Sequence, residues 1–222
     1  MTVEPFKTLN APALPYEGVN VDTDQIIPAR FLSKPRSGGF AQYLFHDLRF
    51  DESGVEKPAF ILNHPIYRSS QILVGEQNFG CGSSRENAVW AIADYGFRVV
   101  IAPSFGDIFF SNSLKNGLLP VELAPDAVEA LLIELQRDPG ASIEVDLVAQ
   151  KVTGPDVKSY GFDIDPFSKH CLLNGIDELD YTLSQIDKIE EFERRHAAEQ
   201  GWVSQDANTG AVPLPAARGS VG

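Results

Sequence analysis

The spacing of hydrophobic residues alternates along the chain between the patterns of buried strands and amphipathic helices. Residues 71–74 form an apolar run ending at Gly75, and residues 98–102 form another, so both are predicted to be buried strands. Between them, apolar residues recur at helical spacing over 85–95, and Gly96 is suited to end that helix. The order strand, loop, helix, strand is typical of α/β proteins.

The pattern continues beyond residue 102 with further helices and strands. The predicted elements are a helix over 104–115, a strand over 118–123, a helix over 125–137, antiparallel strands within 141–153, and helices over 165–175 and 177–196. The first seventy residues show no simple period, and the glycine-rich, cationic segment 34–40 predicts a mobile loop. Small and polar residues with two prolines follow residue 203. We therefore expect one domain over 1–203 and a disordered tail over 204–222.

Charge and hydropathy exclude several classes of partner. The 222 residues carry a formal net charge of −13, which argues against nucleic-acid binding because phosphate contacts need clustered Lys and Arg. No apolar run approaches the roughly 18 residues of a membrane helix, and the N-terminus lacks the pattern of a signal peptide. A cytoplasmic protein with no membrane partner is expected.

Metal-binding residue types are scarce. The chain has two cysteines, Cys81 and Cys171, and four histidines, without a CxxC or HExxH motif. Such a chain cannot ligate a three-cysteine iron–sulfur cluster by itself. We expect no metal site on this chain and two free thiols, so any metal would come from a partner.

The loop over residues 80–86, Gly-Cys-Gly-Ser-Ser-Arg-Glu, carries the strongest chemical signal. It lies between a predicted strand and a predicted helix start, where glycines allow close backbone approach and free N–H groups attract anions. Arg85 adds a fork that matches a carboxylate, and Ser83 and Ser84 add hydroxyl groups. These residues predict a site for a small acid.

A structural interpretation of the same loop competes with this one. Ser83 and Glu86 have the spacing of a capping box, with Ser83 as the N-cap and Glu86 at the third helical position. Arg85 fits that interpretation poorly, because the helix dipole favours anions at an N-terminus. The loop lacks the third glycine of a dinucleotide-binding motif and the Lys of a P-loop.

Four segments, in order, resemble one family. GCGSSREN, preceded by VGEQNF, resembles the catalytic loop of the aconitase-superfamily swivelling domain, and NVDTDQIIPARFL resembles the second substrate-contacting segment of that domain. SFGDIFFSNSLKNGLLPVEL and FDIDPFSKHCLLNGIDELDYTL resemble blocks of the bacterial-type 3-isopropylmalate dehydratase small subunits. The resemblance runs from about Phe6 to about Trp202.

The resemblance implies an α/β fold, a single three-layer β/β/α swivelling domain. It implies a heterodimeric hydro-lyase of leucine biosynthesis that interconverts 2-isopropylmalate and 3-isopropylmalate, small dicarboxylic hydroxy acids, by dehydration and rehydration. No cofactor is expected on this chain, because the large subunit of such enzymes supplies a [4Fe–4S] cluster.

Site residues follow from the same resemblance. Ser83 and Asp24 are expected to be catalytic, because Ser83 resembles the catalytic serine of the family and Asp24 matches its aspartate in a Thr-Asp pair. Ser84 and Arg85 would hold a substrate carboxylate, and Arg36 stands where relatives place a substrate-binding arginine. The chain departs from the family at Asn87, commonly His, and at Ser113, often Cys.

Two alternatives remain open at the level of sequence. A homoaconitase-like or citraconate hydratase small subunit would differ only in the acid that fits, which residues 30–46 should decide. A non-catalytic anion-binding module would use the same helix N-terminus without a large partner.

Overall fold

The computed structural model describes residues 4–82 and 85–199. The chain forms two compact units, Met1–Glu178 and Leu179–Gly222. The first unit contains every strand of the sheet. Within the described part of the second unit are helix α8 and all but the first residue of α7. The expected domain boundary after residue 203 and the tail 204–222 lie outside the described residues and stay predictions.

The elements alternate much as the hydrophobic pattern predicts. The strands are β1 (Thr8–Tyr16), β2 (Ile72–Gly75), β3 (Val99–Ala102), β4 (Leu119–Glu122), β5 (Ser142–Asp146), β6 (Lys151–Thr153) and β7 (Ser159–Gly161). The helices are α1 (Thr23–Ile26), α2 (His46–Arg49), α3 (Glu86–Tyr95), α4 (Asp107–Lys115), α5 (Pro125–Arg137), α6 (Pro166–Asn174), α7 (Glu178–Ser184) and α8 (Ile186–Glu199). The predicted α/β class is confirmed.

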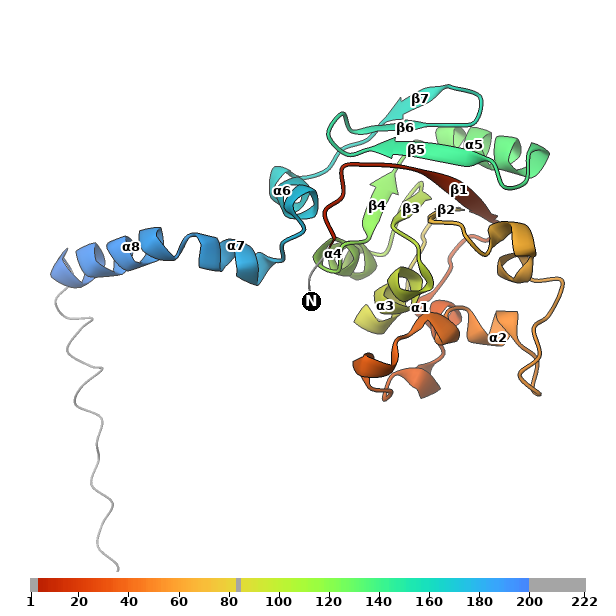
Figure 1. The fold of residues 1–222 in the computed structure, drawn as a ribbon, viewed down its shortest axis with the longest axis horizontal. Helices are drawn as coiled ribbons and strands as arrows, with labels where there is room; N and C mark the ends of the chain where they lie inside the picture. Colours follow the sequence, from red (N-terminus) through yellow and green to blue (C-terminus); the bar gives the residue numbers. More distant parts are fainter. Residues whose placement is uncertain (1–3, 83–84, 200–222) are drawn as a thin grey trace, which may run out of the picture. The chain divides into compact units, whose positions relative to one another are not determined.

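The seven strands of the described residues join one sheet in the order β4-β3-β2-β1-β5-β6-β7. Strands β4, β3, β2 and β1 pair in parallel, and β1, β5, β6 and β7 pair antiparallel, so β1 belongs to both parts. Figure 1 shows the antiparallel strands running at a steep angle to β2–β4. Because β1–β4 are parallel, their carboxyl ends lie at one edge of the sheet, where open α/β sheets bind ligands.

Strand β1 is central, although its sequence discourages that prediction. Pro12 and Pro15 lack the N–H that a ladder needs. The prolines are accommodated because β1 uses different residues for its two partners. It pairs with β5 through Thr8–Pro12 and with β2 through Ala13–Tyr16. Each half therefore has a ladder partner on one side only, and a proline is tolerated where no partner faces its nitrogen.

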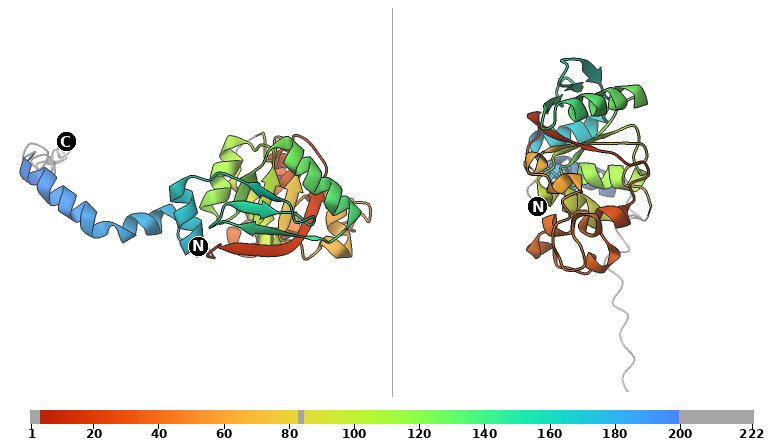
Figure 2. Two further views of the ribbon diagram at one scale, coloured as in Figure 1. Left: turned by 90° about the horizontal axis from the view of Figure 1, so that it is seen from above. Right: turned by 90° about the vertical axis from the view of Figure 1, so that its right-hand side faces the viewer.

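Side chains of the parallel strands alternate between two hydrophobic cores. Leu73 and Val100 pack with α3 on one face, whereas their neighbours Ile72 and Val99 pack with α5 on the other. Figure 2 shows these two helices on opposite sides of the sheet. Both faces of β2 and β3 are covered, which explains why these strands appear as continuous apolar runs rather than alternating ones.

The segment between β1 and β2 packs against α3 and completes the hydrophobic core on that face of the sheet. It contains two short helices, α1 and α2, and several 3-10 turns. Phe40, Leu44 and Phe45 in this segment are fully buried and pack with α3 residues such as Val89. Its order comes from these distant contacts, which is why no local period is visible in the sequence.

The main differences from the predicted elements are in α4, in the C-terminal helices and in β7. Helix α4 begins at Asp107 rather than at residue 104, because residues 103–106 pair with the loop after β2. The helix predicted over 177–196 is divided at Gln185 into α7 and α8. Strand β7 was not predicted and extends the antiparallel part by pairing with β6.

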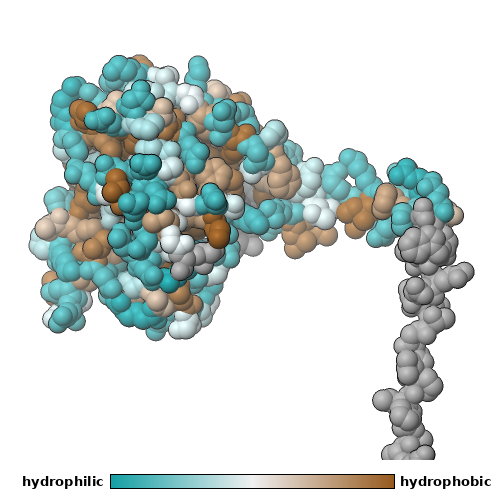
Figure 3. Space-filling view, turned by 180° about the vertical axis from the view of Figure 1, so that it is seen from behind, coloured by the Kyte–Doolittle hydropathy of each residue, from teal (hydrophilic) through white to brown (hydrophobic). Residues whose placement is uncertain are grey.

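Helices α7 and α8 carry no buried residue in the part of the chain that is described. Leu179, Leu183, Ile186 and Phe192 are exposed there, and hydrophobic side chains are visible along this segment in Figure 3. Among residues 4–82 and 85–199, no helix has the length and apolar character needed to cross a membrane.

Candidate active site

Three loops meet where the parallel strands end. Phe79, after β2, donates its N–H to the carbonyl of Ser104 after β3 (3.0 Å), and Gly106 donates to the carbonyl of Phe79 (2.9 Å). Asn20, after β1, donates its N–H to the carbonyl of Gln77 (2.9 Å). These backbone hydrogen bonds hold three separate parts of the sequence together at the carboxyl edge of the parallel strands.

Gly80 is required in this edge for two reasons. Its φ of +72° lies in the left-handed region, and a Cβ at this position would overlap the ring of Phe109 on α4. Gly82 also has a positive φ, of +87°. Both glycines permit the close backbone approach that was expected. Gly80 lies against Phe109 on α4, and a Cβ on Gly82 would contact Asp22 at 3.4 Å.

The Asp-Thr-Asp segment lies directly against the glycine loop. Gly80 and Cys81 donate their N–H groups to the carbonyl of Val21 (2.7 and 3.2 Å), and Thr23 donates to the carbonyl of Cys81 (3.0 Å). Asp22 caps α1 by accepting from the N–H of Gln25 (2.7 Å). The two segments singled out in the sequence are therefore one structural unit.

Asp24 and Arg85 meet as an ion pair at this junction. Arg85 Nη1 donates to Asp24 Oδ1, across 61 positions of sequence. The Arg85 side chain is 16% exposed and that of Asp24 is 56% exposed. Since one nitrogen of a guanidinium with five N–H donors is engaged, Arg85 retains donors for a second carboxylate.

Arg85 also occupies the N-cap position of α3, with extended backbone angles and no side-chain cap hydrogen bond. Glu86 is consequently the first helical residue, and not the third as the capping-box interpretation requires. The helix begins two residues later than that box requires. A cation at the start of α3 remains, as expected, where the helix dipole favours an anion.

Ser83 and Ser84 lie outside the described residues, and their predicted roles stay predictions. Their described neighbours are Gly82 and Arg85, so the two serines connect the glycine loop to the start of α3.

The structure does not bring Arg36 to this junction. Both of its Nη atoms donate to Asp94, in the last turn of α3. Asp94 is eight residues beyond Glu86, which corresponds to about 12 Å along a helix. The segment 34–40, expected to be a mobile loop, contains a 3-10 turn over Arg36–Gly38. Arg30, also cationic, binds Asp47 and holds the pKa of that carboxyl at about 2.

Asn116 and Asp94 are two positions that sequence reasoning missed. Asn116 donates to Glu86 Oε1 and accepts from the Trp90 indole N–H, both at 2.9 Å, and so links the end of α4 to the first turn of α3. Glu86, Trp90 and Asp94 follow each other at intervals of four, on one face of the helix. This spacing on a largely buried helix is a signal that could have identified Asp94.

The two departures from the family have different surroundings. Ser113 is fully buried and donates its hydroxyl to the carbonyl of Phe109 (2.8 Å), so it is satisfied within α4. Asn87 lies in the first turn of α3 and is half-buried.

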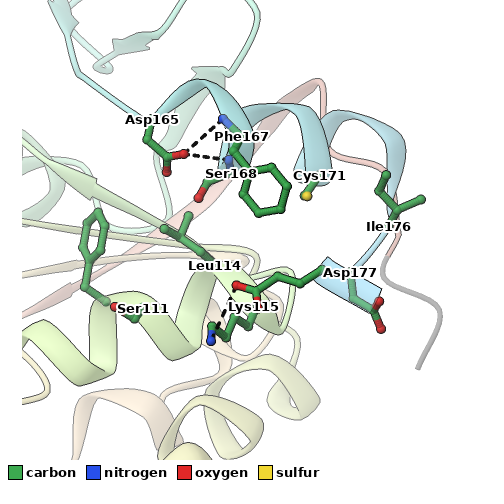
Figure 4. Close-up of a pocket in the computed structure, with 11 residues that line it drawn as sticks. Ser111, Leu114, Lys115, Asp165, Phe167, Ser168, Cys171, Ile176 and Asp177 are labelled. Carbon is green, nitrogen blue, oxygen red and sulfur yellow. Dashed lines mark hydrogen bonds and ion pairs between the residues drawn. The ribbon is translucent and has the colours of Figure 1, made fainter. Parts of the chain in front are cut away.

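A separate pocket of about 250 Å³ lies between α4 and α6 (Figure 4). Leu114, Phe167 and Cys171 line it, and Lys115 pairs with Glu178 at 3.5 Å beside it. Burial, aided by nearby acidic side chains, raises the pKa of the Cys171 thiol, which therefore stays protonated. This pocket contains none of the candidate site residues.

Metal ligands do not converge anywhere in the described ranges. No group of three or more His, Cys, Asp or Glu residues there could hold an ion, and both cysteines are free. The described residues thus do not fit an iron–sulfur cluster.

Comparisons with known proteins agree with this geometry. Residues 3–126 match the model of the aconitase C-terminal domain, and residues 129–166 match the model LeuD_N. The 3-isopropylmalate dehydratase small subunit of Paramagnetospirillum magneticum is 50% identical over 201 residues, which cover 90% of this chain and all of that relative. The corresponding subunit of Rhodospirillum centenum is 48% identical over 90% of this chain and 98% of its own.

A solved structure extends the likeness to the fold. The 3-isopropylmalate dehydratase of Methanocaldococcus jannaschii superposes with a TM-score of 0.60 at 26% identity, covering 84% of this chain and 99% of the other. The expected aconitase-like fold is confirmed. With a curled α/β sheet, a Gly-Cys-Gly loop at its carboxyl edge and a likeness that spans nine-tenths of its length, this chain belongs to the family of 3-isopropylmalate dehydratase small subunits.

Proposed function

We propose that this chain is the small subunit of a cytoplasmic 3-isopropylmalate dehydratase, a hydro-lyase that interconverts 2-isopropylmalate and 3-isopropylmalate in leucine biosynthesis. The enzyme is active only with a large subunit, which supplies the [4Fe–4S] cluster. The observation that supports this most is the meeting of Asp24 and Arg85 at the start of α3.

Arg85 binds a substrate carboxylate in this proposal. Its side chain is mostly buried, so the attraction of its charge is weakly screened by water. The free N–H groups of the first turn of α3 add to the same positive potential. Asp24 fixes the direction of the guanidinium while leaving other donors available.

Ser83 removes the proton next to the substrate carboxylate, with Ser84 helping to hold the acid. A serine hydroxyl is a poor base in water, so the alkoxide needs stabilisation. Neighbouring Arg85 and the N-terminus of α3 are suited to supply it in a water-poor site. Asp24 is exposed in this chain, and closure against the large subunit would exclude water from this edge.

Steady-state kinetics on the reconstituted complex test the proposal. Ser83→Ala and Ser83→Gly should each lower kcat on the order of 10²-fold or more, because the general base is lost. Their stability should change by less than about 0.5 kcal/mol, because Arg85 and not Ser83 is the N-cap of α3.

Ser53→Ala, at an exposed turn, is the matched control and should leave both kinetics and melting unchanged. Near-normal kcat in Ser83→Gly would remove the serine from the mechanism. Turnover or visible cluster absorbance of this chain alone would refute the proposal that the large subunit supplies the cluster and is needed for activity.

A further inference from the structure

The guanidinium of Arg36 is already occupied by a carboxylate of the same chain. Arg36 Nη2 donates to Asp94 Oδ1 at 2.6 Å, and Nη1 donates to Asp94 Oδ2. Asp94 Oδ2 also accepts from the N–H of Phe40 at 2.7 Å. The side chains of Arg36 and Asp94 are 28% and 20% exposed. The fork that would bind a substrate carboxylate is thus filled by an internal one.

Aromatic rings complete this arrangement. The Arg36 guanidinium lies 5.2 Å from the ring centre of Trp90 and 5.7 Å from that of Phe40. The Nε donor of Arg36 is buried and has no hydrogen-bond partner among the described residues. A buried unpaired donor is costly, so the present pairing does not satisfy the guanidinium fully.

We propose that Asp94 is a positioning residue that competes with a substrate carboxylate for Arg36. This inference rests on the proposed function and on the expectation from the sequence that Arg36 binds substrate. Asp94 and the substrate offer the same bidentate acceptor, so the guanidinium can serve one of them at a time through that fork. The apparent affinity for substrate is then reduced by the fraction of enzyme in which Asp94 holds Arg36.

The fluorescence of Trp90 can show whether the Arg36 guanidinium lies over its ring, as it does when paired with Asp94. Its indole N–H is fixed by Asn116, so the ring stays in place when the guanidinium leaves its face. The chain has two tryptophans, Trp90 and Trp202. In the full-length Trp202→Phe chain, excited so that tyrosine does not contribute, tryptophan emission therefore comes from Trp90 alone.

Asp94→Asn is the informative variant. Its amide oxygen can still accept from Phe40, but it no longer has the charge that holds Arg36. In the Trp202→Phe background, Asp94→Asn and Arg36→Ala should change Trp90 emission in the same direction, and the double variant should change it no further. Emission unchanged by Asp94→Asn would mean that Arg36 stays in place and would overturn the proposal.

Kinetics of the reconstituted complex test the competition itself. Asp94→Asn should lower KM for isopropylmalate about threefold or more, and this effect should vanish in an Arg36→Ala background. Asp126→Asn, in the exposed first turn of α5, is the control and should leave KM unchanged. An unchanged or raised KM in Asp94→Asn contradicts the proposal. Absence of turnover in the parent complex would instead refute the proposed function, while Trp90 emission would still decide whether Asp94 holds Arg36.

Discussion

Single side chains at the sheet edge have roles that follow from their partners rather than from their types. Arg85 and Arg36 are both cations in segments that resemble family motifs. Arg85 pairs with exposed Asp24 through one nitrogen and keeps donors for an acid. Arg36 engages Asp94 through both Nη atoms. In the proposed function, Arg85 is therefore the one of the two that is ready to bind substrate.

Arg85→Lys tests whether the guanidinium fork matters beyond its charge. A lysine keeps the positive charge but loses the planar bidentate geometry, so kcat should fall about 10-fold to 100-fold, nearly as much as in Arg85→Ala. Steady-state kinetics on the reconstituted complex measure this. Arg98→Lys, at an arginine that pairs with Glu4, is the matched control. A lysine variant with parental kcat would reduce Arg85 to a point charge.

At the level of elements, the helix that carries a candidate site residue and the helix that only packs in the core lie on opposite faces of the sheet. Helix α5 covers one face and contributes Leu131, which is 1% exposed, to the core there. Helix α3 covers the other face and presents Arg85 at its start. Changes on the α5 side should therefore alter the free energy of unfolding without altering the site.

Leu131→Ala should destabilise the first unit by about 2–5 kcal/mol, because it removes buried methyl groups and leaves a cavity. The kcat of the folded complex should stay near that of the parent. Ile133→Ala, on the same helix but 52% exposed, should cost less than about 0.5 kcal/mol. Chemical denaturation monitored by circular dichroism gives both values. Equal losses in the two variants would mean that α5 does not pack as described.

For the whole molecule, the family places catalysis in an assembly rather than in this chain alone. The described residues offer no set of cluster ligands, and Asp24 at the site edge is exposed. Exposed apolar side chains on α7 and α8 lie in the second unit, after the sheet is complete. The terminal residues 204–222 contribute few apolar groups by composition.

Deleting residues 204–222 should leave folding and activity nearly unchanged, because so few apolar groups cannot offset the entropy lost on ordering. The melting temperature and the kcat of the reconstituted complex should match those of the full chain. A fall of several degrees in melting temperature would show that the tail packs against the protein.

The local pattern alone determined most elements after residue 70. Helix α5 has the predicted bounds, Pro125–Arg137, because its apolar spacing and first-turn proline are properties of neighbouring residues. Strands β2 and β3 were predictable for a similar reason, since strands covered on both faces are continuous apolar runs. Family motifs likewise singled out Asp24 and Arg85, though not the contact between them.

Only the tertiary structure decided which distant residues meet. Asp24 and Arg85 are 61 positions apart, and Arg36 and Asp94 are 58 apart. Pairing over such separations depends on how the sheet is ordered and how the segment before β2 packs beneath α3, neither of which leaves a local period. The start of α3 at Glu86 also depends on this packing, because the ion pair and the extended backbone of Arg85 exclude that residue from the first helical turn. Residue types at the site are a property of the sequence, whereas their partners are set by the fold.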